Sequence, residues 1–327
     1  MKNKLRYSEG ILEAYNYLLK NHNEFFVIGQ GLWSPWYVGE TMKDLDKKYG
    51  KERVIDCPVS ELATTGAAVG ASISGYKPMI VHPRIDFMLL AVDQIVTQAA
   101  KWRYMFGGNS SAPVTFRGII NRGGEQGAQH SQSLHSWFAH IPGLRVVMPY
   151  SPKDARDLMI ASVLCEDPVL FIDDRWLYEV EDDYSEIEIL KIKDQKPRII
   201  ENGNDITVVG IGHTVKLILD SLGEIKSKNI NCEVIDLRIL NPIDYEIIIN
   251  SVSKTGNLLV VDGDWSSCGI AGEIIASVLE KVEPNKLHKS PKRITLPDCP
   301  APTSKVLEDI YYINKKDIVS KVLNFFN

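Results

Sequence analysis

Residues 145–172, RVVMPYSPKDARDLMIASVLCEDPVLFI, contain the pattern that decides the fold. Two short apolar runs, Arg145–Met148 and Val169–Ile172, lie on either side of a longer amphipathic segment, Ser151–Cys165. Ser151 is suited to cap a helix, and the proline and the acid that follow it favour the first turn. A strand, a helix and a second strand in this order predict two parallel strands joined by a helix that covers their sheet.

The same alternation runs through the rest of the chain, and nearly continuous apolar strands are typical of parallel sheets covered on both faces. In the first part, the expected strands are Phe25–Ile28, Met79–Val81 and Val114–Phe116, and the expected helices are Ser8–Lys20, Glu61–Ser74 and Asp86–Phe106. In the second part, strands are expected near Ile206–Ile211, Cys232–Asp236, Leu258–Asp262 and Arg293–Leu296, with helices near Val215–Lys228, Asp244–Ser253, Ile270–Glu283 and Lys315–Phe326.

These patterns predict an α/β fold with two domains, each a mainly parallel sheet flanked by helices. The length of 327 residues agrees with two domains. The acidic stretch EVEDDYSEIE at 179–188 interrupts the alternation and is typical of a solvated connection. We therefore expect a first domain at 1–185, a linker at 186–204 and a second domain at 205–327.

Composition excludes several classes of protein. A net charge of −5 is a poor match for nucleic-acid phosphates. The five cysteines are widely spaced without a CxxC pair, so neither a disulfide framework nor a thiolate metal site is expected, and no other cluster has metal-ligand spacing. The N-terminus lacks an apolar signal core, and no apolar stretch approaches the ~20 residues that span a bilayer. We expect a cytoplasmic protein without a membrane segment.

Common nucleotide and hydrolase motifs fail. Neither GxxxxGK[ST] nor GxSxG occurs. The pair Gly210-x-Gly212, with Asp236 downstream, is part of a dinucleotide fingerprint, but Val215 stands where the third glycine is needed. A tight turn at the end of a parallel strand explains this pair better.

Two stretches have residues suited to a cofactor site. In Asp56–Gly75, DCPVSELATTGAAVGASISG, Glu61 opens a helix of small residues, which allow close approach of another backbone or a cofactor. The alternative is that Glu61 is a first-turn acid favoured by the helix dipole. In Pro83–Ala100, Phe87 at the helix entrance offers a flat face to an aromatic ring, or else belongs to the core.

A third stretch, Arg117–Gly143, begins as a glycine-rich loop after an expected strand. Open α/β sheets bind ligands at such strand ends. His130, His135 and His140 follow the loop on or near an expected helix, and a histidine there can donate a proton near neutral pH. Each of the three is also compatible with a purely structural role.

Together these stretches resemble the beta subunits of branched-chain and pyruvate-type 2-oxoacid dehydrogenases and, more distantly, the later domains of transketolase. The resemblance covers nearly the whole chain. It is carried by Ile55–Glu61, Asp86–Gly108, Gln129–Pro149, Glu233–Asp244 and Leu296–Pro302.

The resemblance implies a pyrimidine-binding domain, a smaller C-terminal domain and thiamine diphosphate bound with an alpha subunit, which holds the diphosphate through Mg²⁺ and a GDG sequence. Asp262-Gly263-Asp264 of this chain is not that motif. By analogy, Glu61 bonds the aminopyrimidine ring nitrogen and Phe87 packs on the ring. His130 of the QHSQ motif lies near the reacting carbon, and Leu62 and Ile85 line the same pocket.

The implied partners are an alpha subunit, in an assembly of two alpha and two beta chains, a second copy of this chain, and a lipoyl acyltransferase. Two alternatives stay open: half of a split transketolase-like enzyme that transfers a two-carbon unit, and a non-catalytic assembly or dinucleotide-binding subunit. Gly29-Gln30-Gly31 lacks an acid that many relatives carry, and His82-Pro83-Arg84 also departs from the pattern. Arg84 then faces a substrate carboxylate or a sugar-like group, or is exposed to solvent, so the 2-oxo acid is not named.

Overall fold

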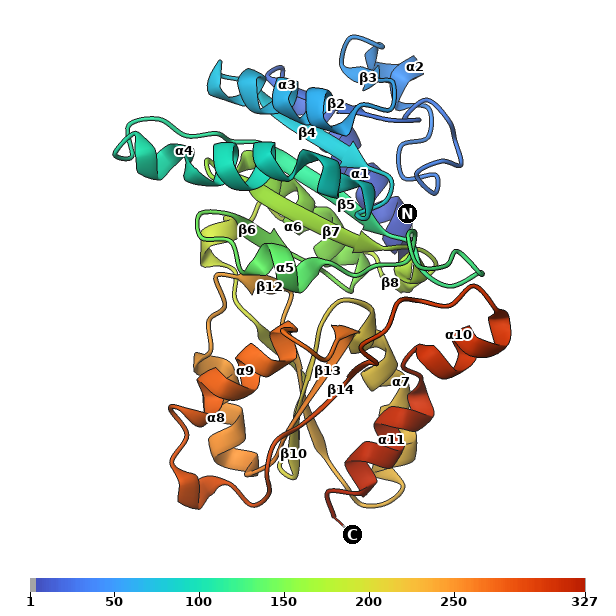
Figure 1. Ribbon diagram of the computed structural model, residues 1–327, viewed down its shortest axis with the longest axis vertical. Coiled ribbons are helices and arrows are strands. Elements are labelled where there is room, and N and C mark those ends of the chain that lie inside the picture. Colours follow the sequence, from blue (N-terminus) through green and yellow to red (C-terminus); the bar gives the residue numbers. More distant parts are fainter. Residues whose placement is uncertain (1–3, 327) are drawn as a thin grey trace. The chain divides into compact units, whose positions relative to one another are not determined.

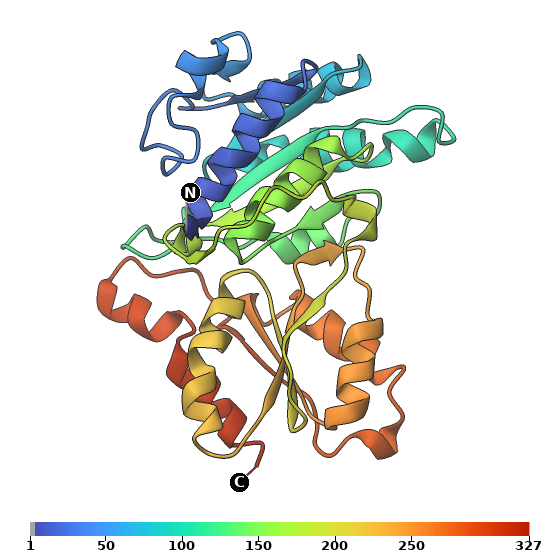
Figure 2. The same cartoon turned by 180° about the vertical axis from the view of Figure 1, so that it is seen from behind.

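The computed structural model describes residues 4–326, which form two compact units. The first unit contains the chain up to Asn121 together with Trp137–Gln195, and the second contains Arg122–Ser136 and the chain from Lys196 onward. Each unit holds one parallel-dominated sheet with helices on its faces, which confirms the predicted fold class (Figures 1 and 2). The loop Arg122–Ser136 thus belongs to the second unit although the residues on either side of it belong to the first.

The sheet of the first unit is parallel throughout, with its strands in the order β6-β7-β5-β4-β2-β3. All the strands expected from apolar runs in this part of the chain are present, and the short β3 is added at one edge. Their bounds are β2 (Phe25–Gly29), β3 (Val54–Asp56), β4 (Lys77–His82), β5 (Thr115–Ile120), β6 (Arg145–Val147) and β7 (Val169–Asp174).

Helices cover both faces of this sheet. On the face seen in Figure 2, α1 (Tyr7–Asn21) packs against α6 (Pro152–Leu164), while α3 (Glu61–Ile73) packs on β4 on the face seen in Figure 1. The predicted cap of α6 is confirmed, because the backbone N–H of Asp154 donates to Ser151 Oγ at 3.2 Å. Shorter elements are α2 (Leu45–Tyr49), α5 (His135–Ala139) and the antiparallel pair β1 (Lys4–Arg6) and β8 (Glu181–Asp183).

The expected single helix over Asp86–Phe106 is irregular, and in this respect the prediction was wrong. A 3₁₀ segment, η1 (Phe87–Ala91), leads into a π-helical segment, η2 (Asp93–Ala99), and then into α4 (Ala100–Met105). One apolar face is kept along all three, so the pattern of apolar residues did not reveal the change of winding. π-helical turns are rare and are frequently found at functional sites.

The second unit has a five-stranded sheet in the order β14-β13-β10-β11-β9. All pairs are parallel except the pair of β11 with β9, which is antiparallel. Strand β9 lies at the edge of the sheet, where the sequence pattern predicts only a connection. The strands are β9 (Arg198–Glu201), β10 (Ile206–Gly210), β11 (Cys232–Asp236), β13 (Leu258–Trp265) and β14 (Lys292–Leu296). The other elements are α7 (His213–Lys226), β12 (Ile239–Asn241), α8 (Glu246–Thr255), α9 (Ile270–Leu279), α10 (Lys305–Tyr311) and α11 (Lys315–Leu323).

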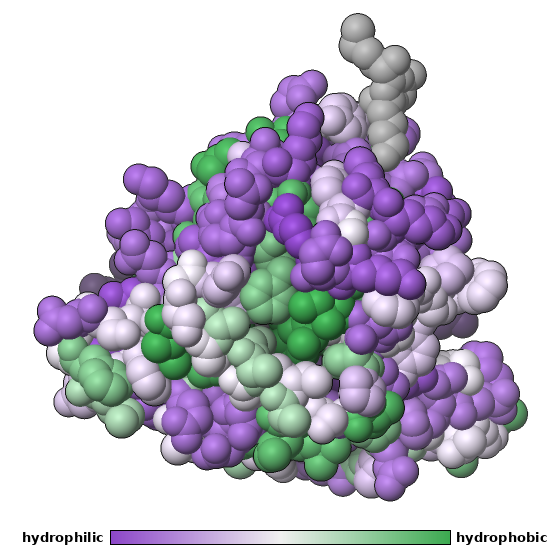
Figure 3. All heavy atoms as spheres, turned by 90° about the horizontal axis from the view of Figure 1, so that it is seen from above, coloured by the Kyte–Doolittle hydropathy of each residue, from purple (hydrophilic) through white to green (hydrophobic). Residues whose placement is uncertain are grey.

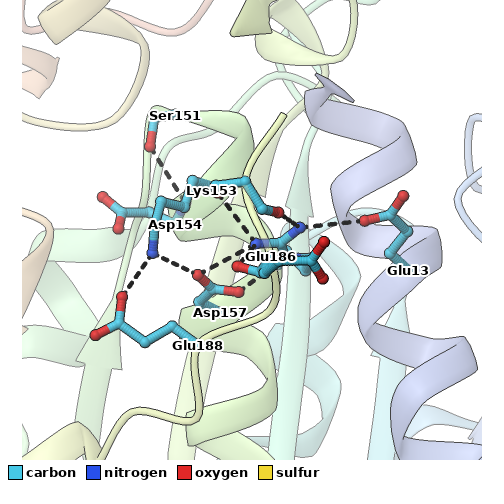
Figure 4. Close-up of polar contacts among 9 residues, drawn as sticks. Glu13, Ser151, Lys153, Asp154, Asp157, Glu186 and Glu188 are labelled. Atoms are coloured by element: carbon cyan, nitrogen blue, oxygen red, sulfur yellow. Dashed lines mark hydrogen bonds and ion pairs between the residues drawn. The ribbon is translucent and has the colours of Figure 1, made fainter. Parts of the chain in front are cut away.

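Polar contacts hold the end of the acidic stretch 179–188 against the first unit, and Figure 4 shows them around Glu186 and Glu188. Arg156 on α6 is fully buried, and its Nη2 donates to the backbone oxygen of Glu186 at 2.8 Å. Its Nη1 lies 3.3 Å from the Glu13 carboxylate on α1. Lys153, one turn earlier, pairs with Glu188 at 2.8 Å. The stretch is therefore held against α6 rather than running free.

A second buried arginine forms an ion pair that connects two strands at the centre of this sheet. Arg117 on β5 and Asp173 on β7 are fully buried and form a bidentate ion pair, with Nε–Oδ1 at 2.9 Å and Nη2–Oδ2 at 2.7 Å. Arg117 also donates to Thr41 Oγ1 at 3.0 Å and to the Tyr15 hydroxyl at 3.3 Å. The Tyr178 hydroxyl donates to Asp173 Oδ2 at 2.6 Å. The pair thus links two strands, α1 and the loop that follows β2.

We expect Arg117→Met or Asp173→Asn to lower the free energy of unfolding by about 3–5 kcal/mol, because each leaves a buried polar or charged group without its partner. The double variant Arg117→Met, Asp173→Leu recovers most of that loss, since it buries no orphaned charge. Urea unfolding followed by tryptophan fluorescence checks this. Single variants as stable as the wild type would show that the pair is not a structural tie.

Candidate active site

Glu61 is the first residue of α3 and is half-buried. The turn around it closes through the Thr64 hydroxyl, which donates to the backbone oxygen of Ser60 at 2.9 Å. Within residues 4–326 the Glu61 carboxylate has neither a hydrogen-bond nor an ion-pair partner. The positive end of the helix dipole favours an ionised carboxylate at this position. The structure therefore presents an acid that is fixed by its backbone and available to a ligand.

The small residues of α3 leave its outer surface open. A Cβ added at Gly66 would lie 3.5 Å from Cγ of Gln94 on η2, which is ordinary contact, and a Cβ added at Gly70 would meet nothing within 4 Å. The glycines are therefore not required by packing within this unit. They leave room for another surface, in agreement with the interface interpretation of this stretch.

The expected cofactor-lining residues lie on α3 and on the turn that leads into η1, and these two helices pack together. Leu62 and Phe87 are 57% and 40% exposed, whereas Ile85 is fully buried. Ile85 donates its backbone N–H to the oxygen of Ile119 at 2.9 Å, and its side chain lies against Gly118. Ile85 thus fixes the turn, while Leu62 and Phe87 offer apolar surface.

Further apolar side chains are exposed near these two. Val59, just before α3, and Leu90 on η1 are both largely accessible. Figure 3, which views the molecule from above Figure 1, shows hydrophobic residues near the middle of this face and in further spots toward its edges, with hydrophilic residues between and around them. An exposed apolar area rimmed by polar residues is typical of a surface that a ligand or a partner covers.

His130 belongs to the second unit, not to the unit that contains Glu61. It is half-buried, and its backbone N–H donates to the oxygen of Gly127 at 3.3 Å. The loop that carries it is tied down elsewhere in the second unit. Arg122 donates to the oxygen of Gly263 at 2.8 Å, and the Glu125 N–H donates to Glu308 Oε1 at 2.9 Å.

His135 has a structural position. It is fully buried, with Nε2 2.9 Å from Asp262 Oδ1 and Nδ1 3.0 Å from Ser133 Oγ. Burial by itself lowers the pKa of His135, but the nearby Asp262 carboxylate, its hydrogen bond and Asp264 outweigh burial and raise this pKa above its ordinary value. His140, the third histidine of the sequence pattern, is exposed.

Arg84 was among the candidate residues predicted from the sequence, whereas Arg175 was not. Arg84 comes two residues after β4, and Arg175 comes directly after β7, so both follow the carboxyl ends of central strands. The overlooked signal is a charged residue placed next to a continuous apolar strand, which is where open α/β sheets bind ligands. Among residues 4–326, no group of three or more His, Cys, Asp or Glu side chains is arranged to hold a metal ion. No helix in that range is both long and apolar enough to cross a bilayer.

Comparison with known proteins agrees with this architecture. Residues 3–180 match the transketolase pyrimidine-binding domain, and residues 195–318 match the transketolase C-terminal domain. The chain is 35% identical to the pyruvate dehydrogenase E1 component subunit beta of Rickettsia bellii, over 96% of each chain. It is 39% identical to the acetoin:2,6-dichlorophenolindophenol oxidoreductase subunit beta of Bacillus subtilis, over 86% of this chain and 82% of that one.

A solved structure of a split-gene transketolase, an inactive beta4 tetramer, has the same fold, with a TM-score of 0.76 at 18% identity over 98% of this chain and 97% of that one. Together with the matched domains and relatives, the fold defines a transketolase-like, thiamine-diphosphate-dependent class of protein. The chain belongs to the family of 2-oxoacid dehydrogenase E1 beta subunits.

The ion pair of His135 predicts a pH dependence of stability. Because its folded-state pKa is raised, the pair contributes fully below the unfolded pKa of about 6.5, and its contribution is lost as pH rises through the folded-state value. We expect His135→Gln to lower the melting temperature more at about pH 5.5 than at about pH 8.5. Thermal unfolding across this range measures the difference, with the exposed His140→Gln as control. A loss that grows with pH would contradict the assignment.

Proposed function

We propose that this chain, joined to an alpha subunit, carries out oxidative decarboxylation of a 2-oxo acid with acyl transfer to a lipoyl carrier. The observation that supports this best is the Glu61 carboxylate, which lacks a partner in residues 4–326 and stands at the start of a helix beside exposed apolar side chains. A carboxylate beside exposed apolar side chains suits the aminopyrimidine end of thiamine diphosphate. When bound, that coenzyme supplies the electron sink for decarboxylation.

In this proposal Glu61 binds the aminopyrimidine ring nitrogen and exchanges a proton with it. The fixed first turn of α3 holds the carboxylate in place, so that little ordering is required during the reaction. Phe87 provides a flat apolar face for the ring, and Leu62 covers its edge and excludes water. Ile85 contributes indirectly, because its backbone hydrogen bond fixes the turn that presents Phe87.

His130 is proposed as the proton donor near the reacting carbon. Its backbone lies in a loop that contacts of Arg122, Glu125 and His135 attach to the second unit. Histidine is the side chain best suited to act as a general acid or base in catalysis.

The diphosphate end is assigned to the partner subunit. The only aspartates that resemble a metal-binding sequence in this chain, Asp262 and Asp264, are already engaged within it. Asp262 Oδ1 accepts from His135 and from the backbone N–H of Asp264, at 2.9 and 3.2 Å. We therefore place Mg²⁺ on the alpha subunit, in an assembly of two alpha and two beta chains that also pairs this chain with a second copy of itself. A lipoyl acyltransferase is the proposed acceptor.

We expect Glu61→Ala to lower kcat of the reconstituted complex by at least about 100-fold while assembly is kept, because proton transfer at the ring is lost. A panel of 2-oxo acids with a dye acceptor measures this. Glu246→Ala, which removes an exposed first-turn glutamate of α8, is the matched control and keeps full activity. Full activity of Glu61→Ala would support a non-catalytic subunit. Cleavage of ketose substrates without turnover of any 2-oxo acid would support the split transketolase.

We also expect the isolated chain to bind thiamine diphosphate at least about 100-fold more weakly than the assembled complex, since the charged half of the coenzyme is held by the partner. Calorimetric titration of both with the coenzyme and Mg²⁺ compares the dissociation constants. Equal affinity in the two samples would mean that the isolated chain contains the diphosphate site.

A further inference from the structure

Two of the five cysteines, Cys268 and Cys299, are exposed, and both lie at the carboxyl edge of the second unit's sheet. The other three, Cys57, Cys165 and Cys232, are buried or half-buried. Loss of hydration raises the pKa of each of these three thiols, to about 12 for Cys232. Because the thiolate is the form that reacts with oxidants, only the exposed pair is available for such chemistry.

The two exposed cysteines occupy equivalent positions on neighbouring strands. Strands β13 and β14 run parallel, and Trp265 pairs with Leu296 where both strands end (Figure 1). Cys268 and Cys299 each follow that pair by three residues. Since the two chains leave the sheet side by side and in the same direction, the register places the two thiols on adjacent loops.

A carboxylate joins these two loops one residue before each cysteine. Asp298 accepts from the backbone N–H of Ser267 at 2.9 Å and from the Ser267 hydroxyl at 2.7 Å. A disulfide requires Cα atoms about 4.4–6.8 Å apart, and consecutive Cα atoms are about 3.8 Å apart. Beyond the contact of Ser267 with Asp298, only one residue on each loop has to change its backbone angles for the two sulfurs to meet.

The two loops differ in how firmly they are held. The backbone oxygen of Cys299 accepts from Trp265 Nε1 and from the Tyr311 hydroxyl, both at 2.9 Å. Cys268 instead has a φ of 57°, in the left-handed region that residues with a Cβ rarely adopt. A strained position of this kind in an exposed loop is a candidate for function. Because a change of φ at Cys268 relieves that strain, we expect this loop to move toward Cys299.

We propose that Cys268 and Cys299 are a redox modification site, at which a peroxide converts the two thiols into a reversible disulfide within the second unit. One thiol reacts as the thiolate with hydrogen peroxide and becomes a sulfenic acid, and water is released. The second thiol attacks the sulfenic sulfur, the S–S bond forms and a second water leaves. An external dithiol reduces the bond by exchange and is itself oxidised to a disulfide, and exposed disulfides are the ones open to this attack.

The loops that carry the cysteines also support the segment that contains the proposed proton donor. Ile270, two residues after Cys268, donates its backbone N–H to Ser136 Oγ at 3.0 Å. A Cβ added at Gly127 would lie 2.8 Å from Thr303 Oγ1, so the chain that follows the other cysteine also contacts this segment. Closure of the disulfide therefore displaces supports of the histidine between Gly127 and Ser136. This consequence for activity rests on the function proposed above, whereas the disulfide itself does not.

The first test examines the full-length chain without any turnover. Treated with an equimolar amount of hydrogen peroxide, the native wild type should lose both rapidly reacting thiols in a dithionitrobenzoate assay. It should also become about 2 Da lighter, the mass of the two hydrogens lost when a disulfide forms. Digestion should then give a cross-linked peptide that contains Cys268 and Cys299, and dithiothreitol should restore both thiols.

Serine variants assign the bridge to this pair. Cys268→Ser and Cys299→Ser should each keep one rapidly reacting thiol before oxidation and form no cross-link within the chain afterwards. Cys165→Ser, which removes a half-buried cysteine, is the matched control and should still form the cross-link. A wild-type chain that only gains oxygen atoms, or that is cross-linked only to a second copy, would overturn the proposal.

The second test uses the complex with the alpha subunit. Oxidised and reduced chains are freed of reagent before assembly, and kcat is measured on 2-oxo acids with a dye acceptor. Oxidation should lower kcat at least about fivefold, because a small displacement of a proton donor slows the reaction, and dithiothreitol should restore it. The double variant Cys268→Ser, Cys299→Ser should keep the kcat of the reduced wild type after the same treatment.

The outcomes separate the disulfide from the function proposed above. An unchanged kcat in a complex whose disulfide has formed would reject control of activity by this site. No turnover of any 2-oxo acid by the reduced complex would reject the proposed function instead, and the mass of the oxidised chain would still decide whether Cys268 and Cys299 form the bond.

Discussion

The buried pair of Arg117 and Asp173 is the constraint on which the first unit depends. It crosses from β5 to β7 at the centre of the sheet, and through Tyr15 and Thr41 it also reaches α1 and the loop after β2. A buried ion pair adds little net stability compared with apolar packing, but its bidentate geometry tolerates few arrangements. It therefore serves to fix how the strand ends line up, and Asn121 and Arg175 project from those ends.

The second unit uses a different device to fix a loop. The segment that contains His130 lies between residues of the first unit along the chain, yet its contacts are with β13 and with the C-terminal helices. The ion pair of His135 with Asp262 is the most deeply buried of these contacts. The residues next to His130 in the sequence therefore say little about what holds it in position. Residues more than a hundred positions away in the chain do so.

Local patterns predicted the regular elements well, because each depends on residues close together in the chain. The cap at Ser151 and the apolar runs of β2, β4 and β7 are examples. The edge strand β9 was missed because its residues are only partly buried and polar residues surround it. The winding of η2 was missed because the expected apolar face fits both helix types. Residues 61, 87 and 130 came from family resemblance, whereas the pairing of Arg117 and the position of Arg175 required the fold.

The open surface of α3 has a consequence for the production of the protein. A helix of alanines and glycines with exposed Leu62 at its start, beside exposed Phe87, has much apolar area in contact with water until something covers it. Such areas favour nonspecific association between copies. Chains synthesised in excess over their covering partner would then precipitate or be degraded, so balanced translation of the two polypeptides limits the yield of usable enzyme.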